Sequence, residues 1–258
     1  MLSAETRRGL AERLWRAERE RDPIPPLVES HPDIDVVDAY EIQLINIRRR
    51  DAPIAGHKVG LSSPAMQQMM GVDEPDYGHL LTDMAVAEDV PVDTRAYCFP
   101  RVEVEVGFLL AEDVPPGCDE QGVLDRTEAL IPSIELIDSR IRDWRIGIAD
   151  TIADNASSAG YVLGAARVAP GELDPRGIDA VLHRNGEVVA EGRSDAVLGN
   201  PATAVAWLAD KVAGFGVRLR AGNVVLPGSC TRAIDVRPGD AFRAEFSGLG
   251  TVGLTAKP

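Results

Sequence analysis

Two glutamates on one expected strand, and a third about thirty residues later, are the first candidates for chemistry. Glu103 and Glu105 alternate with valines in residues 101–106, and a period of two is typical of a β-strand. The valines then face one side, and the two carboxylates project from the other, about 7 Å apart. Glu135 interrupts a second apolar run, residues 131–137, in the same way.

Like charges on an interior strand repel each other and are costly to desolvate unless a cation lies between them. Three carboxylates on two apolar strands fit a hard divalent ion with oxygen ligands, Mg²⁺ or Mn²⁺. The spacing leaves one alternative open. Glu103 and Glu105 could form a solvated sheet face, with Glu135 paired to Arg101 or Arg140.

Lys58 lies in another expected strand, residues 54–61, beside His57, so the two side chains point to opposite faces. A lysine in an apolar strand can bind a carboxylate or transfer a proton. The alternative is a lysine whose ammonium reaches solvent. The histidines are isolated in the sequence and are interpreted as structural. The sequence contains no G-x-S-x-G nucleophile elbow, no H-E-x-x-H zinc-peptidase motif, no Cys–His pairing and no dinucleotide or phosphate-loop fingerprint.

The elements that must position these residues follow from caps and periodicity. Ser3 and Asp35 can cap two amphipathic helices, which we expect to form a packing or assembly segment over residues 1–52. Residues 53–258 change to short strands and turns, without regular βαβ alternation. We expect an α+β domain with a curved or rolled mixed sheet.

Four further local features are expected in this second part of the chain. They are a turn-rich polar loop over residues 73–80, a helix from Asp119 to Leu130, a hairpin turning at Asn185-Gly186, and a helix starting at Asn200-Pro201.

Composition limits the choice of partner. The 258 residues carry 27 basic and 41 acidic side chains, which argues against nucleic acid or an anionic membrane. A small anionic substrate is compatible, because a metal ion reverses the local field. No segment reads as a membrane span or a signal peptide, so we expect a cytoplasmic protein. Three scattered cysteines indicate reduced thiols.

Five motifs occur together and in order over nearly the whole chain. Their set is similar to the 2-hydroxypenta-2,4-dienoate hydratase (2-keto-4-pentenoate hydratase) family, within the fumarylacetoacetate hydrolase-like superfamily. The motifs are G-H-K-V-G-L-S-S-P-A-M-Q (56–67), D-E-P-D-Y-G-H-L (73–80), R-V-E-V-E-V-G-F (101–108), P-S-I-E-L-I-D-S-R-I (132–141) and T-I-A-D-N-A-S-S (151–158).

The resemblance implies a fumarylacetoacetate hydrolase-like β-roll with an N-terminal helical segment. It also implies a divalent metal, Mg²⁺ or Mn²⁺, and a substrate pocket. The implied metal ligands are Glu103, Glu105 and Glu135, and the implied pocket residues are Lys58, Asp76 and Ser158.

We expect water to be added to a short 2-hydroxy-dienoate, giving a 4-hydroxy-2-oxoacid, in the breakdown of aromatic or steroid rings. Lys58 and Asp76 would move protons, while Ser158 and the amides around Leu80 would hold the substrate carboxylate. No organic cofactor is required. We also expect a homo-oligomer, with a complex with another enzyme of the pathway as a further expectation.

Two alternatives are kept. The sister family, 4-oxalocrotonate (2-oxo-3-hexenedioate) decarboxylase, shares the metal motif. Its substrate carries a second carboxylate that favours an extra cation at the far end of the pocket, and no such cation is identified in the sequence. The second alternative is a metal-stabilised scaffold without enzymatic activity.

Overall fold

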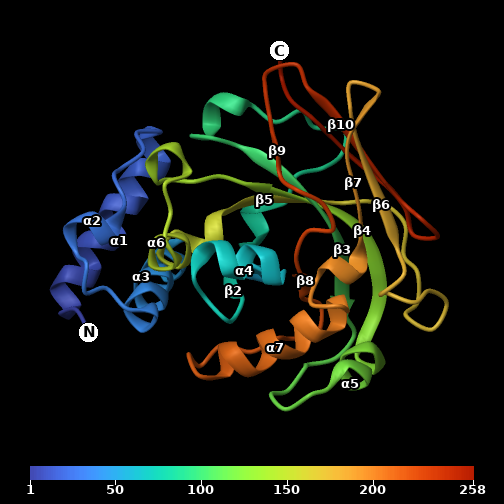
Figure 1. The fold of residues 1–258 in the computed structure, drawn as a ribbon, viewed down its shortest axis with the longest axis horizontal. Helices are drawn as coiled ribbons and strands as arrows, with labels where there is room; N and C mark the ends of the chain where they lie inside the picture. The colour runs from blue at the N-terminus through green and yellow to red at the C-terminus, as the bar shows by residue number, and fades with distance from the viewer.

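Two β-sheets and a set of helices build the fold (Figure 1). The computed structural model describes residues 1–258, apart from the side chains of Ala65 and Met69. The helices are α1 (Ala4–Glu20), α2 (Leu27–Ser30), α3 (Val36–Arg49), α4 (Pro64–Met70), α5 (Glu120–Asp125), α6 (Ile148–Ala153) and α7 (Pro201–Ala213).

The larger sheet carries the candidate site. Its order is β2-β1-β8-β3-β4-β5, with β9 paired to β3. Only β1 and β8 pair in parallel within it, so the sheet is mixed. Its strands are β1 (Ile54–Gly60), β2 (Asp76–Leu81), β3 (Arg101–Leu110), β4 (Thr127–Ile137), β5 (Ser158–Leu163), β8 (Val224–Leu226) and β9 (Ile234–Asp235).

The smaller sheet lies on the side of the molecule away from the N-terminal helices (Figure 1). Its order is β11-β10-β6-β7, all antiparallel. Asn185 and Gly186 both have positive φ between β6 and β7, as the expected type I′ turn requires. The strands are β6 (Asp179–Arg184), β7 (Glu187–Arg193), β10 (Ala241–Phe246) and β11 (Gly250–Thr255). Together the two sheets and the helices confirm the α+β class.

Strand β3 lies inside the larger sheet, as its alternation predicts. It is hydrogen-bonded to β4 on one side and to β8 and β9 on the other. Val102, Val104 and Val106 are fully buried, and their face of the sheet belongs to the main hydrophobic core. The opposite face holds the glutamates.

The N-terminal helices are capped as expected and are joined to the sheet by a buried side chain. Ser3 accepts a hydrogen bond at the start of α1, and Asp35 does so at the start of α3. Gln43 of α3 donates from Nε2 to the carbonyls of Tyr77 (2.9 Å) and Ile152 (2.8 Å). The helical segment therefore supports both β2 and α6. A division into two units at residue 52 stays a prediction.

Two local expectations were wrong. The expected polar loop over residues 73–80 is a strand from Asp76 on, and all six residues of β2 are buried. A polar composition usually indicates an exposed loop, but the polar side chains of β2 are buried within the protein. The expected helix from Asp119 ends at Asp125, and β4 starts at Thr127. Pairing of β4 with β3 outweighs local helix propensity there.

Along the described chain, no helix combines the length and apolar character that a membrane span requires.

We predict that Gln43→Leu destabilises the fold, because two buried backbone carbonyls lose a donor. The expected loss in the free energy of unfolding is at least about 1 kcal/mol, measured by urea titration. Gln121→Leu is the matched control, since the Gln121 amide bonds only the exposed side chain of Asp125. It should change stability by less than about 0.5 kcal/mol. Equal losses in both variants would contradict the bridging role of Gln43.

Candidate active site

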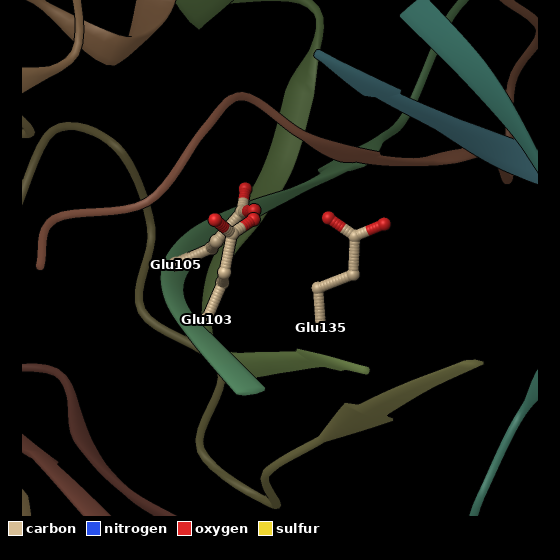
Figure 2. Close-up of side chains that lie close together, drawn as sticks. All are labelled: Glu103, Glu105 and Glu135. Atoms are coloured by element: carbon tan, nitrogen blue, oxygen red, sulfur yellow. The ribbon is translucent and has the colours of Figure 1, made fainter. Parts of the chain in front are cut away.

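Three glutamates meet on one face of the larger sheet. Glu103 of β3 lies directly opposite Glu135 of β4, and Glu105 follows two residues along on the same face. One carboxylate oxygen of each lies within 4.8 Å of the others. Figure 2 shows the three side chains rising from the sheet on the same side. Strand register thus unites carboxylates that are thirty residues apart.

Two of these carboxylates are fully buried, and Glu103 is half-buried at the wall of a cavity. Glu105 and Glu135 are fully buried, and burial raises the pKa of both. Their mutual repulsion, together with Glu103, raises the pKa of Glu105 further. For Glu135, burial raises the pKa to about 7 although Lys58 opposes the shift.

The cluster fits a divalent cation. Oε1 of Glu105 and both carboxylate oxygens of Glu135 are buried without a hydrogen-bond partner among the described atoms. Buried polar atoms are normally paired, and anionic oxygens are the ligands that Mg²⁺ and Mn²⁺ prefer. Among the described residues, Glu135 does not pair with either arginine of the alternative. Arg101 pairs with Asp235, and Arg140 pairs with Asp154.

Lys58 places a positively charged ammonium group beside the carboxylate cluster. Its Nζ lies 3.5 Å from Oε2 of Glu135 and donates a hydrogen bond to the carbonyl of Ala156 at 2.9 Å. The residue is only 3% exposed, so the ammonium does not reach solvent. Burial lowers the pKa of Lys58, but Glu135 and the other nearby carboxylates outweigh it and raise the pKa above its ordinary value. Lys58 is therefore held as an ammonium beside the cluster.

Asp76 faces the same space from β2. It is paired in register with Gly60 of β1, and Lys58 lies two residues before Gly60 on the same face. A Cβ on Gly60 would lie 2.2 Å from Oδ1 of Asp76 and 3.4 Å from Nζ of Lys58. The glycine therefore makes room for both charged groups. Burial raises the pKa of Asp76, and the Lys58 ammonium opposes that shift.

A left-handed turn delivers the carbonyl that binds Lys58. Asn155, Ala156 and Ser157 have φ values of 55°, 49° and 59°, a conformation that is strained for residues other than glycine. The Asn155 side chain fastens the turn to β2. It accepts from the amide of His79 (2.8 Å) and donates to the carbonyl of His79 (3.0 Å).

The segment after β8 continues alongside β3, with an antiparallel bridge between Ser229 and Glu105. The amide of Gly228 donates to Oε2 of Glu105 at 2.7 Å, and Oγ of Ser229 accepts from the amide of Val104 at 3.1 Å. Gly228 has a φ of 127°, and a Cβ there would overlap Oγ of Ser62. Only a glycine fits this position.

A cavity of about 240 Å³ opens onto these groups. Its charged lining residues are Lys58, Asp76, Glu103 and Arg232. The apolar part of its wall comes from Met66, Ile137, Trp144 and Ile146. Carboxylates on one side of the cavity and apolar side chains on the other suit a small anion with a hydrocarbon part, provided that a metal ion neutralises the carboxylates.

Comparisons with known proteins agree with this architecture. A family model described as fumarylacetoacetate (FAA) hydrolase C-terminal matches residues 69–255. The chain belongs to the fumarylacetoacetate hydrolase family.

The similar proteins of this family have defined activities. A 2-keto-4-pentenoate hydratase from Paraburkholderia xenovorans (strain LB400) is 40% identical over 255 residues, covering 97% of this chain and 95% of the relative. A 2-oxo-hept-4-ene-1,7-dioate hydratase from Escherichia coli is 38% identical over 262 residues, 98% of each protein. A solved 4-oxalocrotonate decarboxylase from Pseudomonas putida G7, complexed with magnesium and adipate, is 34% identical with a TM-score of 0.95, covering 99% of each chain.

Two predicted substrate-binding residues of this fumarylacetoacetate hydrolase family member, Leu80 and Ser158, do not line the large cavity, although Ser158 lies close enough to Glu135 to lower the pKa of that carboxyl group. The Leu80 side chain belongs to a separate apolar cluster, with Leu81 and Met84. Oγ of Ser158 is buried without a hydrogen-bond partner among the described atoms and lines a smaller cavity with Arg140. Neither residue is among the described residues that line the 240 Å³ cavity. Their roles in substrate binding stay predictions.

Sequence reasoning missed several residues that shape this site. Gly60, Asn155, Gly228 and Arg232 were not singled out, although Gly60 and Asn155 fall inside the quoted motifs. A glycine two residues after a strand lysine is a detectable signal for close approach. The contribution of the segment from Gly228 to Arg232 depends on long-range packing, so no local pattern marks it.

We predict that Glu105→Gln weakens metal binding while stabilising the metal-free protein. The glutamine oxygen can still accept from Gly228, but one of three mutually repelling charges is removed. After treatment with a chelator, the Tm of the variant should equal or exceed that of the wild type. Saturating Mn²⁺ should then raise the Tm of the wild type by several degrees, and that of the variant much less.

The exposed Glu112→Gln serves as the charge-matched control and should behave like the wild type. An equal rise in Tm with Mn²⁺ in wild type and Glu105→Gln would contradict the site.

Proposed function

We propose that this protein is a metal-dependent hydratase acting on 2-hydroxypenta-2,4-dienoate or a short alkyl homologue. The product from the five-carbon substrate is 4-hydroxy-2-oxopentanoate. The observation that carries the proposal is the cluster of three glutamates beside Lys58, which reaches the cavity through Glu103 and Lys58. Similarity over nearly the full chain to proteins named 2-keto-4-pentenoate hydratase supports it.

Glu103, Glu105 and Glu135 would hold the ion, Mg²⁺ or Mn²⁺. When bound, the ion supplies Lewis acidity toward the carboxylate and the C2 oxygen of the substrate. The magnesium complex of the similar decarboxylase supports a divalent metal in this fold.

The chain's own groups then hold and move protons. Ketonisation moves the proton of the 2-hydroxyl group away from oxygen and places a proton on C5. Water next contributes its hydroxyl to C4 and a proton to C3, so the net change is one added water. Nζ of Lys58 and the carboxyl group of Asp76 line the cavity and are the groups that share these transfers.

Positioning of these groups comes from the surrounding backbone. The carbonyl of Ala156 and the carboxylate of Glu135 fix the direction of the Lys58 ammonium. Ile137, Trp144 and Ile146 line the apolar wall and keep water away from the hydrocarbon part of the substrate. Ser158 and the amides around Leu80 remain the proposed holders of the substrate carboxylate, as the family resemblance implies.

Decarboxylation of 2-oxo-3-hexenedioate is the second candidate function. The TM-score of 0.95 with a 4-oxalocrotonate decarboxylase favours it. Incubation with 2-hydroxypenta-2,4-dienoate and Mg²⁺ or Mn²⁺ tests the first proposal, with the dienoate absorbance and the product mass as readouts. Loss of absorbance with a mass gain of one water supports hydration. No change in this assay, together with CO₂ release from 2-oxo-3-hexenedioate, would replace hydratase with decarboxylase.

We also propose the setting in which the enzyme works. It is a cytoplasmic homo-oligomer in aromatic or steroid ring breakdown, and it associates with another enzyme of that pathway. Light scattering that shows only a monomer at micromolar concentration would refute the oligomer.

We predict that Lys58→Met lowers kcat for hydration by roughly 100-fold or more, the scale of a positioned acid–base group. Lys58→Arg should not restore it, because a guanidinium does not readily release a proton. Steady-state kinetics give kcat, and a Mn²⁺ titration checks metal affinity separately.

The exposed Lys257→Met controls for the loss of a lysine charge and should keep wild-type kcat. Near-normal kcat in Lys58→Met would assign proton transfer to Asp76 instead.

A further inference from the structure

Arg232 is a charged residue of the cavity wall that the reaction described above does not use. It lines the same cavity as Lys58, Asp76 and Glu103. Lys58 is buried whereas Arg232 is exposed, so the two cations lie at different depths, one at the floor and one at the mouth.

The Arg232 guanidinium is held in place without being neutralised. Its Nη2 donates to the carbonyl of Val189 at 2.8 Å. Nearby in the chain and in the sheets, Arg101 pairs with Asp235 at 2.8 Å and Arg193 with Asp195 at 3.6 Å. Within the described structure, Arg232 forms no such ion pair. Its remaining N–H donors are available to an anionic ligand.

The segment that carries Arg232 is fixed relative to the carboxylate cluster. The amide of Gly228 bonds Glu105, Oγ of Ser229 accepts from the amide of Val104, and the amide of Thr231 donates to Oγ of Ser229 at 3.4 Å. Arg232 follows directly. The backbone just before Arg232 is therefore anchored to β3 beside the cluster, and the bond to Val189 holds the guanidinium.

We propose that Arg232 binds a second, distal carboxylate of the substrate. Dicarboxylic 2-hydroxy-dienoates would then be substrates in addition to the monoacids of the proposed function, and the protein would prefer the diacids. The inference rests on the proposed function, because the dienoate end must occupy the carboxylate cluster and Lys58. Met66, Ile137, Trp144 and Ile146 then contact the hydrocarbon between the two charged ends.

Charge chemistry favours this choice of substrate. An alkyl end would desolvate part of a guanidinium without giving it a partner, whereas a carboxylate gives it a charge-assisted hydrogen bond. A distal carboxylate is also a feature of the 4-oxalocrotonate decarboxylase substrate, so Arg232 would bind either kind of diacid, and the product mass distinguishes hydration from decarboxylation.

The names of the similar proteins include both diacid and monoacid substrates, so they do not decide which class this protein prefers. One relative is a 2-oxo-hept-4-ene-1,7-dioate hydratase, and one solved structure holds adipate. Other relatives of the same identity are named for the five-carbon monoacid. Sequence identity therefore does not separate the two substrate classes, and the argument rests on Arg232.

The test compares kcat/KM for 2-oxo-hept-4-ene-1,7-dioate and for 2-hydroxyhexa-2,4-dienoate, with Mg²⁺ present. The wild type should prefer the diacid by at least tenfold. Arg232→Gln should lower kcat/KM for the diacid at least ten times more than for the monoacid, mainly through KM. Arg232→Lys should keep part of the preference, because it keeps the charge but not the planar fork. Arg218→Gln, an exposed arginine outside this cavity, is the matched control and should leave the ratio unchanged.

Inhibition provides a second readout that does not need turnover of the diacid. Adipate should compete with the monoacid more strongly than hexanoate does, and Arg232→Gln should remove that difference. The inference would be overturned if the wild type prefers the monoacid, or if Arg232→Gln lowers kcat/KM for both substrates by the same factor. Either result would leave the proposed hydratase function standing. Absence of hydration with either substrate would instead overturn the proposed function.

Discussion

Burial of like charges is the constraint on which the rest of this structure depends. Three carboxylates converge on one face of the sheet, and Glu105 and Glu135 are fully buried there. Lys58 supplies one positive charge against them. An excess of buried negative charge is costly in a protein interior, so the folded arrangement is complementary to a divalent cation. The same cation would make an otherwise acidic cavity attractive to an anionic substrate.

Several unusual backbone features make sense only as supports for this cluster. The glycine at position 60 leaves room for Asp76 and Lys58, and the left-handed turn at residues 155–157 supplies a carbonyl to the ammonium. Each strained residue in that turn lowers the stability of the fold by on the order of 1 kcal/mol or more. The two hydrogen bonds between the Asn155 side chain and the backbone of His79 in β2 offset part of this loss. Rigid support of this kind keeps a charged group at a fixed direction for proton transfer.

Local sequence patterns predicted much of the metal cluster but little of the cavity around it. Alternation was enough to place Glu103 and Glu105 on one face, because side-chain direction in a strand is a local property. The position of Glu135 directly opposite Glu103 depends on strand register. A single carboxylate in each apolar run suggested the grouping of the three glutamates, and the family resemblance strengthened it. The composition of strand β2 is typical of a polar loop, although its polar residues are buried against the rest of the protein instead of facing solvent. Arg232 reaches the cavity through packing that no local pattern records.

The most direct test of the account is a crystal structure of the protein grown with Mn²⁺, with diffraction data collected at the manganese absorption edge. The account predicts one strong anomalous peak on the sheet face, with a carboxylate oxygen from each of Glu103, Glu105 and Glu135 as ligands. The peak should disappear in crystals of Glu105→Gln treated in the same way. A wild-type structure with no peak among these glutamates, or with Mn²⁺ bound only elsewhere, would contradict the central claim.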